Sequence, residues 1–307
     1  MFILLLTPEG RRSAHRLGLT ALELLLVICI LSLVGALLVA AVQKVRVAAA
    51  RAACLDRTRT IGVALHSYHA AHGRFPPGVC PVRDDHPTPA LAWPAQLLPY
   101  LGREPLAAQT AAAFAAERDF QVDPPHVGLA TVVREFTCPS DGRTHAVQAV
   151  GSGRVPRAFT SYLGVAGTRA AWEDGVLFVG SRVRIADVTD GASSTLLVGE
   201  RPPGADLVFG WWYAGWGQAQ DGDADSVLGV RARNRSSYAP GCPEGPYPFA
   251  AGEFADPCAA FHFWSPHPAG ASFLFVDGSA RHVRYAADAI LPGLATRAGS
   301  EAVSPDD

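Results

Sequence analysis

Lysine is nearly absent from the sequence, since Lys44 is the only lysine among 26 basic residues, and 28 acidic residues outnumber them. No basic stripe is present, so we expect no nucleic acid among the partners of this protein. The chain also lacks a G-x-S-x-G nucleophile motif, and it lacks the Cys-x-x-Cys and Cys/His spacings typical of structural zinc. These absences argue against a hydrolase and against a zinc-stapled module, and we expect no enzymatic activity.

One hydrophobic run dominates the N-terminal region. Residues 24–42 contain no charged side chain, and with residues 19–23 they reach the roughly 20 residues that a helix needs to cross a bilayer core. A secretory signal peptide would have a shorter apolar core, ended by a small-residue cleavage site and polar sequence. Arg11, Arg12 and Arg16 lie just before the run, so the positive-inside rule places the N-terminus in the cytoplasm. We predict a single membrane span over residues 19–42, with the remainder of the chain outside.

Glu23 is a carboxylate near the start of this run, where an ionised side chain is costly unless it is paired. One interpretation is that it lies at the headgroup edge and costs little. The surrounding pattern, Arg16-x-Gly18-Leu19-Thr20-x-x-Glu23, favours a second interpretation, because it resembles the cleavage signal of type IV prepilins and pseudopilins. Two features depart from that family: Leu19 stands where Phe is preferred, and the leader begins with an unusual apolar patch, Phe2 to Leu6.

This resemblance implies that residues 1–18 are a cytoplasmic leader, which a prepilin peptidase removes by cutting between Gly18 and Leu19. The same enzyme would methylate the new amine of Leu19. Glu23 would pair with that amine on a neighbouring subunit during assembly. The implied partners are the prepilin peptidase, other pilin-like subunits and the membrane. The implied location is the bacterial inner membrane, with an extracytoplasmic head that can enter a filament.

The sequence beyond the span predicts an α+β protein. Helix-forming residues continue over residues 43–73 and end before Pro76-Pro77, so we expect a single long N-terminal helix, with a further helical region over residues 90–119. Short apolar runs separated by Asp or Gly then predict strands joined by turns: 131–138, 158–167, 175–180, 194–200, 206–216, 271–276 and 280–285. We expect a pilin-like head domain over residues 74–293 with an antiparallel sheet, and a disordered tail over residues 294–307.

Most of the six cysteines lie beyond the span, in a compartment that permits disulfides. Cys242 and Cys258 bracket a loop rich in proline and glycine, and this pair is the favoured disulfide. Cys138 can pair with either Cys54 or Cys80, and the sequence does not choose between them.

The C-terminal region contains His267 and, after nine further residues, Asp277-Gly278. This H-x9-DG motif resembles that of a large bacterial family of pilin-like proteins whose head is a domain of unknown function. Further segments of the chain resemble the same family in the same order: LDRTRTIGVALHSYHAAHGRFPPG, LLPYL, FTCPSD and VTDGASSTLLVGER. His267 and Asp277 can form a binding or catalytic pair. Alternatively, Asp277-Gly278 turns a hairpin and His267 caps the loop before it, which is the interpretation we favour.

An acidic stretch offers a weak candidate for calcium. Asp221, Asp223 and Asp225 imitate the first half of a calcium loop, although Ser226 and Ala232 stand where an EF-hand needs Gly and Glu. Aromatic residues just before it would make a sugar-stacking platform if they were exposed: Trp211, Trp212, Tyr213 and Trp216.

These patterns lead to two hypotheses about function. The leading one is a pilin-like (pseudopilin) structural subunit of a type IV pilus or a type II secretion-like assembly. The alternative is a membrane-tethered extracytoplasmic module that binds glycan or calcium.

Overall fold

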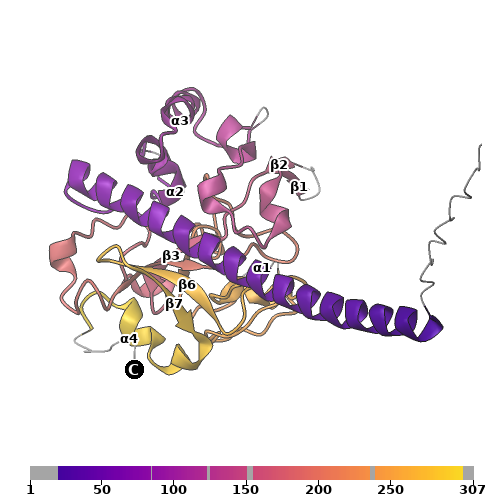
Figure 1. Cartoon of the computed structure of the whole chain (residues 1–307). Helices are drawn as coiled ribbons and strands as arrows, with labels where there is room; N and C mark the ends of the chain where they lie inside the picture. The colour runs from indigo at the N-terminus through magenta and orange to yellow at the C-terminus, as the bar shows by residue number, and fades with distance from the viewer. Residues whose placement is uncertain (1–19, 84, 123–124, 151–154, 236–238, 300–307) are drawn as a thin grey trace, which may run out of the picture. The chain divides into compact units, whose positions relative to one another are not determined.

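The computed structural model describes residues 20–83, 85–122, 125–150, 155–235 and 239–299 (Figure 1). By its internal contacts the chain forms two compact units, residues 1–48 and residues 49–307. Helix α1, Ala21–His72, runs through both. The apolar part of α1 in the first unit makes it the one helix among the described residues that is long and apolar enough to span a membrane or act as a signal anchor.

The ends of α1 follow from local residues. Thr20 precedes the first turn, and its side chain exchanges hydrogen bonds with Glu23. At the other end, Gly73 adopts a φ of 70°, a left-handed conformation that glycine tolerates and that ends a helix. Pro76 and Pro77 follow and cannot continue it. The helix therefore ends where the sequence predicted.

Within the second unit, one face of α1 packs on the head. The buried residues recur at helical spacing on a single face: Cys54, Thr58, Ile61, Gly62, Ala64 and Leu65. Tyr162 reinforces this contact, because its hydroxyl donates a hydrogen bond of 3.1 Å to the carbonyl oxygen of Cys54. Figure 1 shows this part of α1 crossing the strands of the head.

A five-stranded sheet forms the centre of the head, in the order β5-β3-β4-β6-β7. The strands are β3 (Tyr162–Gly167), β4 (Leu196–Glu200), β5 (Val227–Gly229), β6 (Gly270–Phe275) and β7 (Ala280–Arg284). Most neighbours are antiparallel, but β5 runs parallel to β3, with Gly164 opposite Val227. The α+β class is confirmed, and the predicted antiparallel sheet differs in one pair: β5 is parallel to β3, so the sheet is mixed. Strands β1 (Gln148–Val150) and β2 (Val155–Arg157) form a separate antiparallel pair.

Both faces of the sheet are covered, and the strands alternate between them with a period of two. On β6, Leu274 belongs to the cluster that contains Ile61 and Leu65 of α1. Its neighbours Phe273 and Phe275 belong to a second cluster, formed with loops and the C-terminal helix α4 (Leu291–Ala295). The sheet therefore holds α1 on one side and the loop-rich C-terminal half on the other.

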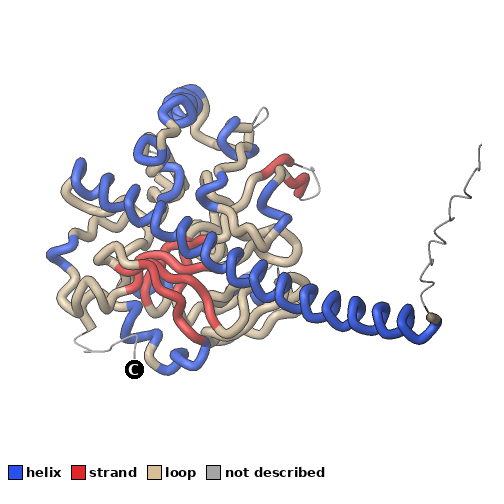
Figure 2. The backbone as a smooth tube through the Cα atoms, in the orientation of Figure 1, coloured by secondary structure: helices blue, strands red, loops and turns tan. Residues whose placement is uncertain are grey.

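Loops make up much of the head (Figure 2), and several predicted elements are absent. The predicted region 90–119 is broken into α2 (Trp93–Gln96), a 3-10 turn (Leu98–Leu101) and α3 (Glu104–Ala116). The predicted strands 131–138, 175–180 and 206–216 are loops, turns and isolated bridges. Apolar residues of these segments are buried although no strand pairing forms. Two of the segments are joined by a side-chain hydrogen bond instead, in which Trp212 Nε1 donates to the carbonyl oxygen of Thr131 at 2.8 Å. Further 3-10 turns connect the elements: Val127–Ala130, Arg134–Phe136, Gly142–His145, Ala170–Trp172, Ile185–Asp187, Pro257–Phe261 and Tyr285–Ala289.

The start of the predicted tail is also corrected. Leu294 and Ala295 are fully buried, and the backbone N–H of Arg297 donates to the carbonyl oxygen of Asp174 at 3.0 Å. Residues 294–299 therefore belong to the packed head, because these apolar side chains complete the second cluster. Residues 300–307 lie outside the described residues.

Candidate functional site

The predicted assembly residue Glu23 lies in the first turn of α1. Its Oε2 accepts hydrogen bonds from the backbone N–H of Thr20 at 2.8 Å and from the Thr20 hydroxyl at 2.9 Å. In return, the N–H of Glu23 donates to Thr20 Oγ1 at 3.3 Å. This reciprocal arrangement is a capping box, which satisfies donors that the start of a helix leaves free. The predicted cleavage residues Gly18 and Leu19 lie outside the described residues.

The motif residue His267 lies in a buried cluster that the sequence did not reveal. Its partners come from α1, from the loop before β1 and from the end of β4: Cys54, Cys138 and Glu200. The Sγ atoms of Cys54 and Cys138 are 2.6 Å apart. His267 Nε2 lies 3.2 Å from Cys54 Sγ and 3.7 Å from Cys138 Sγ. Glu200 Oε1 lies 3.8 Å from His267 Nε2. The cluster therefore joins four distant parts of the chain.

Burial controls the charge of this cluster. Glu200 is completely buried, which raises the pKa of its carboxyl group, while Oε2 accepts a hydrogen bond of 3.2 Å from the backbone N–H of Ser272. Within the described part of the chain, Oε1 has no hydrogen bond. Burial also lowers the pKa of His267, and the charge of Arg51 acts in the same direction. The pKa of the Cys138 thiol is raised by its hydrogen bond with Cys54 and by burial. The fold therefore favours the neutral forms of these groups.

Two kinds of chemistry suit this set of side chains. The four donor atoms lie within 4.8 Å of one another, and two thiols, an imidazole and a carboxylate are ligands for divalent zinc. Alternatively, the adjacent thiols can oxidise to a disulfide. Neither arrangement resembles a nucleophile activated for catalysis, because all four side chains are buried.

The second half of the motif has a different role. Asp277-Gly278 forms the turn between β6 and β7, where Gly278 adopts a φ of 85° and the Asp277 carboxylate accepts a hydrogen bond of 2.8 Å from the N–H of Ser279. Asp277 also lies 3.7 Å from Arg281. The interpretation of Asp277-Gly278 as a hairpin turn therefore agrees with the structure. The predicted capping role of His267 does not, because its imidazole contacts the two cysteines instead.

The acidic stretch is already paired within the head. One guanidinium nitrogen of Arg235 lies 2.7 Å from Asp221 and 3.0 Å from Asp223. Asp225 instead accepts backbone hydrogen bonds from Gly210 at 3.2 Å and Gly217 at 2.7 Å. Burial raises the pKa of Asp225 to about 7 and that of Asp223 to about 6, the latter also because Asp221 is close. A calcium ion at this stretch would have to displace Arg235.

Beside Asp225 lies a pocket of about 510 Å³, a size suited to small ligands. Of the predicted aromatic platform, Trp211 and Trp216 line the pocket, whereas Trp212 and Tyr213 are buried in the core. The guanidinium of Arg157 lies 3.5 Å from the centre of the Trp211 ring. Among the described residues, neither Arg157 Nη1 nor Trp211 Nε1 has a hydrogen-bond partner, although both atoms are buried.

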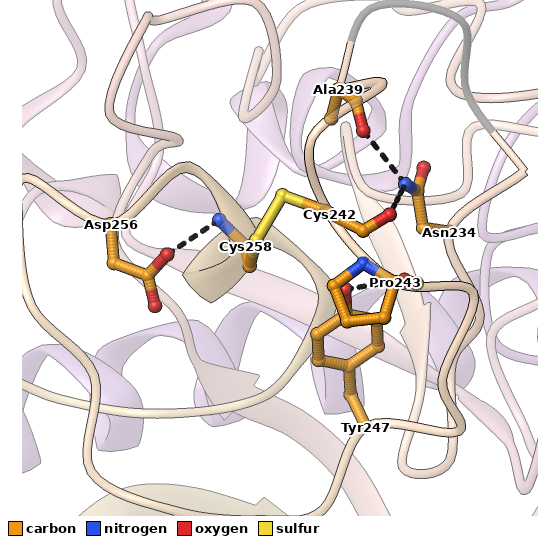
Figure 3. The surroundings of a disulfide bond; sticks show 7 residues. All are labelled: Asn234, Ala239, Cys242, Pro243, Tyr247, Asp256 and Cys258. Atoms are coloured by element: carbon orange, nitrogen blue, oxygen red, sulfur yellow. Dashed lines mark hydrogen bonds between the residues drawn. A yellow bond between two sulfur atoms is a disulfide. The ribbon is translucent and has the colours of Figure 1, made fainter.

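A disulfide joins Cys242 and Cys258, the pair that the sequence favours (Figure 3). The bond lies among loop residues held by side-chain hydrogen bonds. Asn234 Nδ2 donates to the carbonyl oxygens of Ala239 and Cys242, both at 2.9 Å. The Asp256 carboxylate accepts from the N–H of Cys258 at 2.9 Å. Cys80 lies elsewhere in the core, with a contact of 3.7 Å to the Thr88 hydroxyl.

Sequence reasoning missed Glu200 and Arg157 as site residues. Glu200 stands within the quoted segment VTDGASSTLLVGER, and an acid that ends an otherwise apolar strand is the signal that could have identified it. Arg157 stands in a short segment without a motif, and no sequence signal marks it.

The fold and these sites define an α+β protein with an N-terminal apolar helix and a head closed around a cysteine–histidine–glutamate cluster. Residues 43–289 match the model of a family described as protein of unknown function (DUF1559), and the chain belongs to this family. No curated protein and no solved structure matches the chain.

Proposed function

We propose that the protein is a pilin-like structural subunit, anchored in the bacterial inner membrane by α1 and assembled through it into a type IV pilus or a type II secretion-like pseudopilus. A prepilin peptidase removes residues 1–18 and methylates Leu19. The head stands on the extracytoplasmic side and contributes contact surfaces rather than catalysis.

One observation carries this proposal: α1 is a single uninterrupted helix with two different environments. Its first part exposes large apolar side chains all round, including Leu25, Ile28 and Leu37, as expected of a helix whose partners are lipid or other helices. From Cys54 to Leu65 the same helix buries one face in the head. The same helix therefore supplies both the candidate membrane span and part of the head core.

The start of α1 supports the proposal in a second way. The Thr20–Glu23 capping box would remain after cleavage at Gly18, since both residues follow the cut. A carboxylate at this depth gains most from a cationic partner, because water stabilises it poorly there.

The test of processing is mass spectrometry of the N-terminus. The full-length chain is produced in cells with and without an active prepilin peptidase, and its N-terminal peptide is sequenced. We expect N-methylated Leu19 as the first residue when the peptidase is present. Gly18→Ala should reduce cutting, because a side chain is added at the scissile bond, whereas Ser13→Ala in the leader should not. An intact leader in the presence of the peptidase would contradict the proposal.

The second candidate function is a tethered glycan-binding module, which the pocket beside Asp225 favours. Trp211 and Trp216 line the pocket together with Arg157, whose guanidinium lies over the Trp211 ring. A sugar ring would stack on the indoles, and an acidic group of the sugar would pair with the guanidinium. Calcium is a weaker version of this candidate, because Arg235 already neutralises Asp221 and Asp223.

A glycan array tests this candidate with the full-length chain in detergent. The matched pair of variants is Arg157→Gln, which removes the charged donor from the pocket, and Arg184→Gln, which removes an exposed arginine paired with Asp187. Glycan binding that is lost in Arg157→Gln alone would support the module. If no glycan binds, or if binding is unchanged in Arg157→Gln, the pocket is not a glycan site and the structural subunit remains the proposed function.

A further inference from the structure

We propose that Cys54 and Cys138 are joined by a disulfide that ties α1 to the head, with Glu200 and the motif histidine His267 packed against the bond. The sulfur atoms are 2.6 Å apart, and both side chains are completely buried. The inference rests in part on the proposed extracytoplasmic location of the head, since that compartment permits disulfides.

The fold brings these two cysteines together by fixing the backbone on both sides. Cys54 is held by the hydrogen bond that Tyr162 donates to its carbonyl oxygen. The N–H of Cys138 donates to Ser161 Oγ at 2.9 Å, and its carbonyl oxygen contacts His145 Nε2 at 3.0 Å. One turn along α1 from Cys54, the Arg57 guanidinium donates to the hydroxyl of Thr137 at 3.1 Å and also to the carbonyl oxygen of that residue. Cys138 therefore meets Cys54 through contacts that do not depend on the sulfur atoms.

The geometry favours a covalent bond over a shared metal ion. Two thiolates bound to tetrahedral zinc at about 2.3 Å would lie about 3.8 Å apart, more than 1 Å beyond the observed separation. Charge points the same way. Two thiolates, a zinc ion and ionised Glu200 would leave a net negative charge in the core, where unbalanced charge is costly. A disulfide is neutral and leaves Glu200 and His267 as a neutral pair.

Formation of the bond is a two-electron oxidation. The S–H bonds of Cys54 and Cys138 break and one S–S bond forms. The two electrons and two protons pass to the disulfide of an extracytoplasmic thiol–disulfide oxidoreductase, which becomes a dithiol. Because both thiols are buried once α1 has packed, the exchange takes place before the head closes. His267 then lies 3.2 Å from Cys54 Sγ and covers the bond.

The proposed bond also gives the histidine of the H-x9-DG motif a structural role. Glu200 at the end of β4 and His267 in the loop before β6 lie beside the two sulfur atoms, so the sheet on which α1 packs covers the bond. Loss of the bond would leave α1 held to the head by packing and hydrogen bonds alone. The disulfide therefore fixes the anchor helix to the head covalently, at the first buried residue of α1.

The direct test is disulfide mapping of the wild-type, full-length chain. Cells are treated with N-ethylmaleimide at harvest, and the chain is denatured, alkylated again, digested without reductant and analysed by mass spectrometry. We expect a Cys54–Cys138 peptide pair and a Cys242–Cys258 pair, with Cys80 alkylated. Alkylated Cys54 and Cys138 beside an intact Cys242–Cys258 pair would overturn the inference while leaving the proposed location standing. Alkylation of Cys242 and Cys258 as well as Cys54 and Cys138 would also contradict the proposed extracytoplasmic location of the head.

Metal analysis of the same preparation addresses the competing arrangement. One zinc ion per chain together with alkylated Cys54 and Cys138 would replace the disulfide by a metal site and overturn the inference. We expect a zinc content well below one per chain. In the folded chain, mild reductant should open Cys242–Cys258, where Cys258 is partly exposed, before it opens Cys54–Cys138.

Variants supply a second readout with a matched control. Cys138→Ser should lower the thermal unfolding midpoint of the head. It should also abolish the part of the reductant-induced decrease in that midpoint that comes from opening Cys54–Cys138. Cys80→Ser changes another buried thiol, which contacts the Thr88 hydroxyl rather than a second sulfur, and should keep that part of the decrease. If Cys138→Ser does not fold, the mapping of the wild-type chain still decides. A midpoint in Cys138→Ser that matches Cys80→Ser under oxidising conditions would contradict the proposal.

Discussion

Gly62 of α1 lies so close to Leu274 of β6 that a Cβ atom at position 62 would be 2.7 Å from Leu274 Cδ1. Leu274 is completely buried and belongs to the same cluster as Ile61 and Leu65. The absence of a side chain at Gly62 therefore lets the helix approach the sheet. This close approach places Cys54, two turns earlier on the same face, against the head.

Gly62→Leu is predicted to destabilise the head by about 1–3 kcal/mol, the usual cost of forcing extra carbon atoms into a packed core. The gain in helix propensity from losing glycine, about 1 kcal/mol, offsets only part of this cost. The control is Val63→Leu, one residue away, because Val63 is exposed. Denaturant unfolding of the two variants would decide, and equal stability would show that α1 does not pack as described.

Removal of the Cys242–Cys258 bond is predicted to cost roughly 3 kcal/mol, the chain-entropy value for a loop of this length, and often less in practice. The two cysteines are 16 positions apart, and the loop between them is rich in proline and glycine. The test is urea unfolding of the double variant Cys242→Ser, Cys258→Ser beside the wild-type chain. A midpoint unaffected by the substitutions would contradict a stabilising role for the bond.

The buried carboxyl of Asp225 is predicted to make stability fall as pH rises. Its pKa is about 7 in the folded head against 3.8 for an ordinary aspartate, because burial disfavours the charged form. Between these pH values the folded state holds a proton that the unfolded state has released, so unfolding becomes easier as pH increases through this window. Asp223, with a pKa raised to about 6, acts in the same direction.

Asp225→Asn isolates this contribution from that of His267 and His282, whose lowered pKa values make stability fall at acidic pH. The free energy of unfolding is measured for both chains from about pH 4 to pH 7. The difference between wild type and Asp225→Asn should shift against the wild type as pH rises. A difference that is constant, or that shifts in its favour, would show that Asp225 is ionised throughout.

The sequence predicted the elements whose signals are local. The apolar run and the Gly73 stop predict α1, and short apolar runs between Asp and Gly turn signals predict β3, β4, β6 and β7. It failed where burial comes from loops. The stretch around Trp211 and Trp212 has the composition of a strand, but it forms only isolated bridges, with Trp212 and Tyr213 buried among loops. Composition predicts a paired strand here, but tertiary packing of the aromatic side chains determines a loop conformation instead.

The site was less accessible to sequence reasoning, because its residues are distant in the chain. Cys54 and Cys138 are 84 positions apart, and only the docking of α1 on the sheet brings their sulfur atoms together. The motif marked His267 without revealing its partners, and Glu200 carried no motif of its own. The parallel strand β5 was also missed, since Val227–Gly229 is too short to show periodicity.

We propose that the Glu23 carboxylate receives the amine of Leu19 from a neighbouring subunit. Glu23→Gln is a selective change, because glutamine at this position also completes a capping box with Thr20. Membrane insertion and cleavage after Gly18 should therefore persist. Assembly should be impaired, because the incoming amine meets a neutral amide and keeps most of its desolvation cost.

The matched control is Thr20→Ala, which breaks the capping box but keeps the carboxylate. The decisive measurement is chemical cross-linking of membranes from cells that express wild-type chain, Glu23→Gln and Thr20→Ala at equal levels. We expect cross-linked oligomers for wild type and Thr20→Ala, and a marked loss of them for Glu23→Gln. Oligomers from Glu23→Gln as abundant as those of the wild type would show that Glu23 serves the helix cap alone, and would contradict the subunit-pairing role.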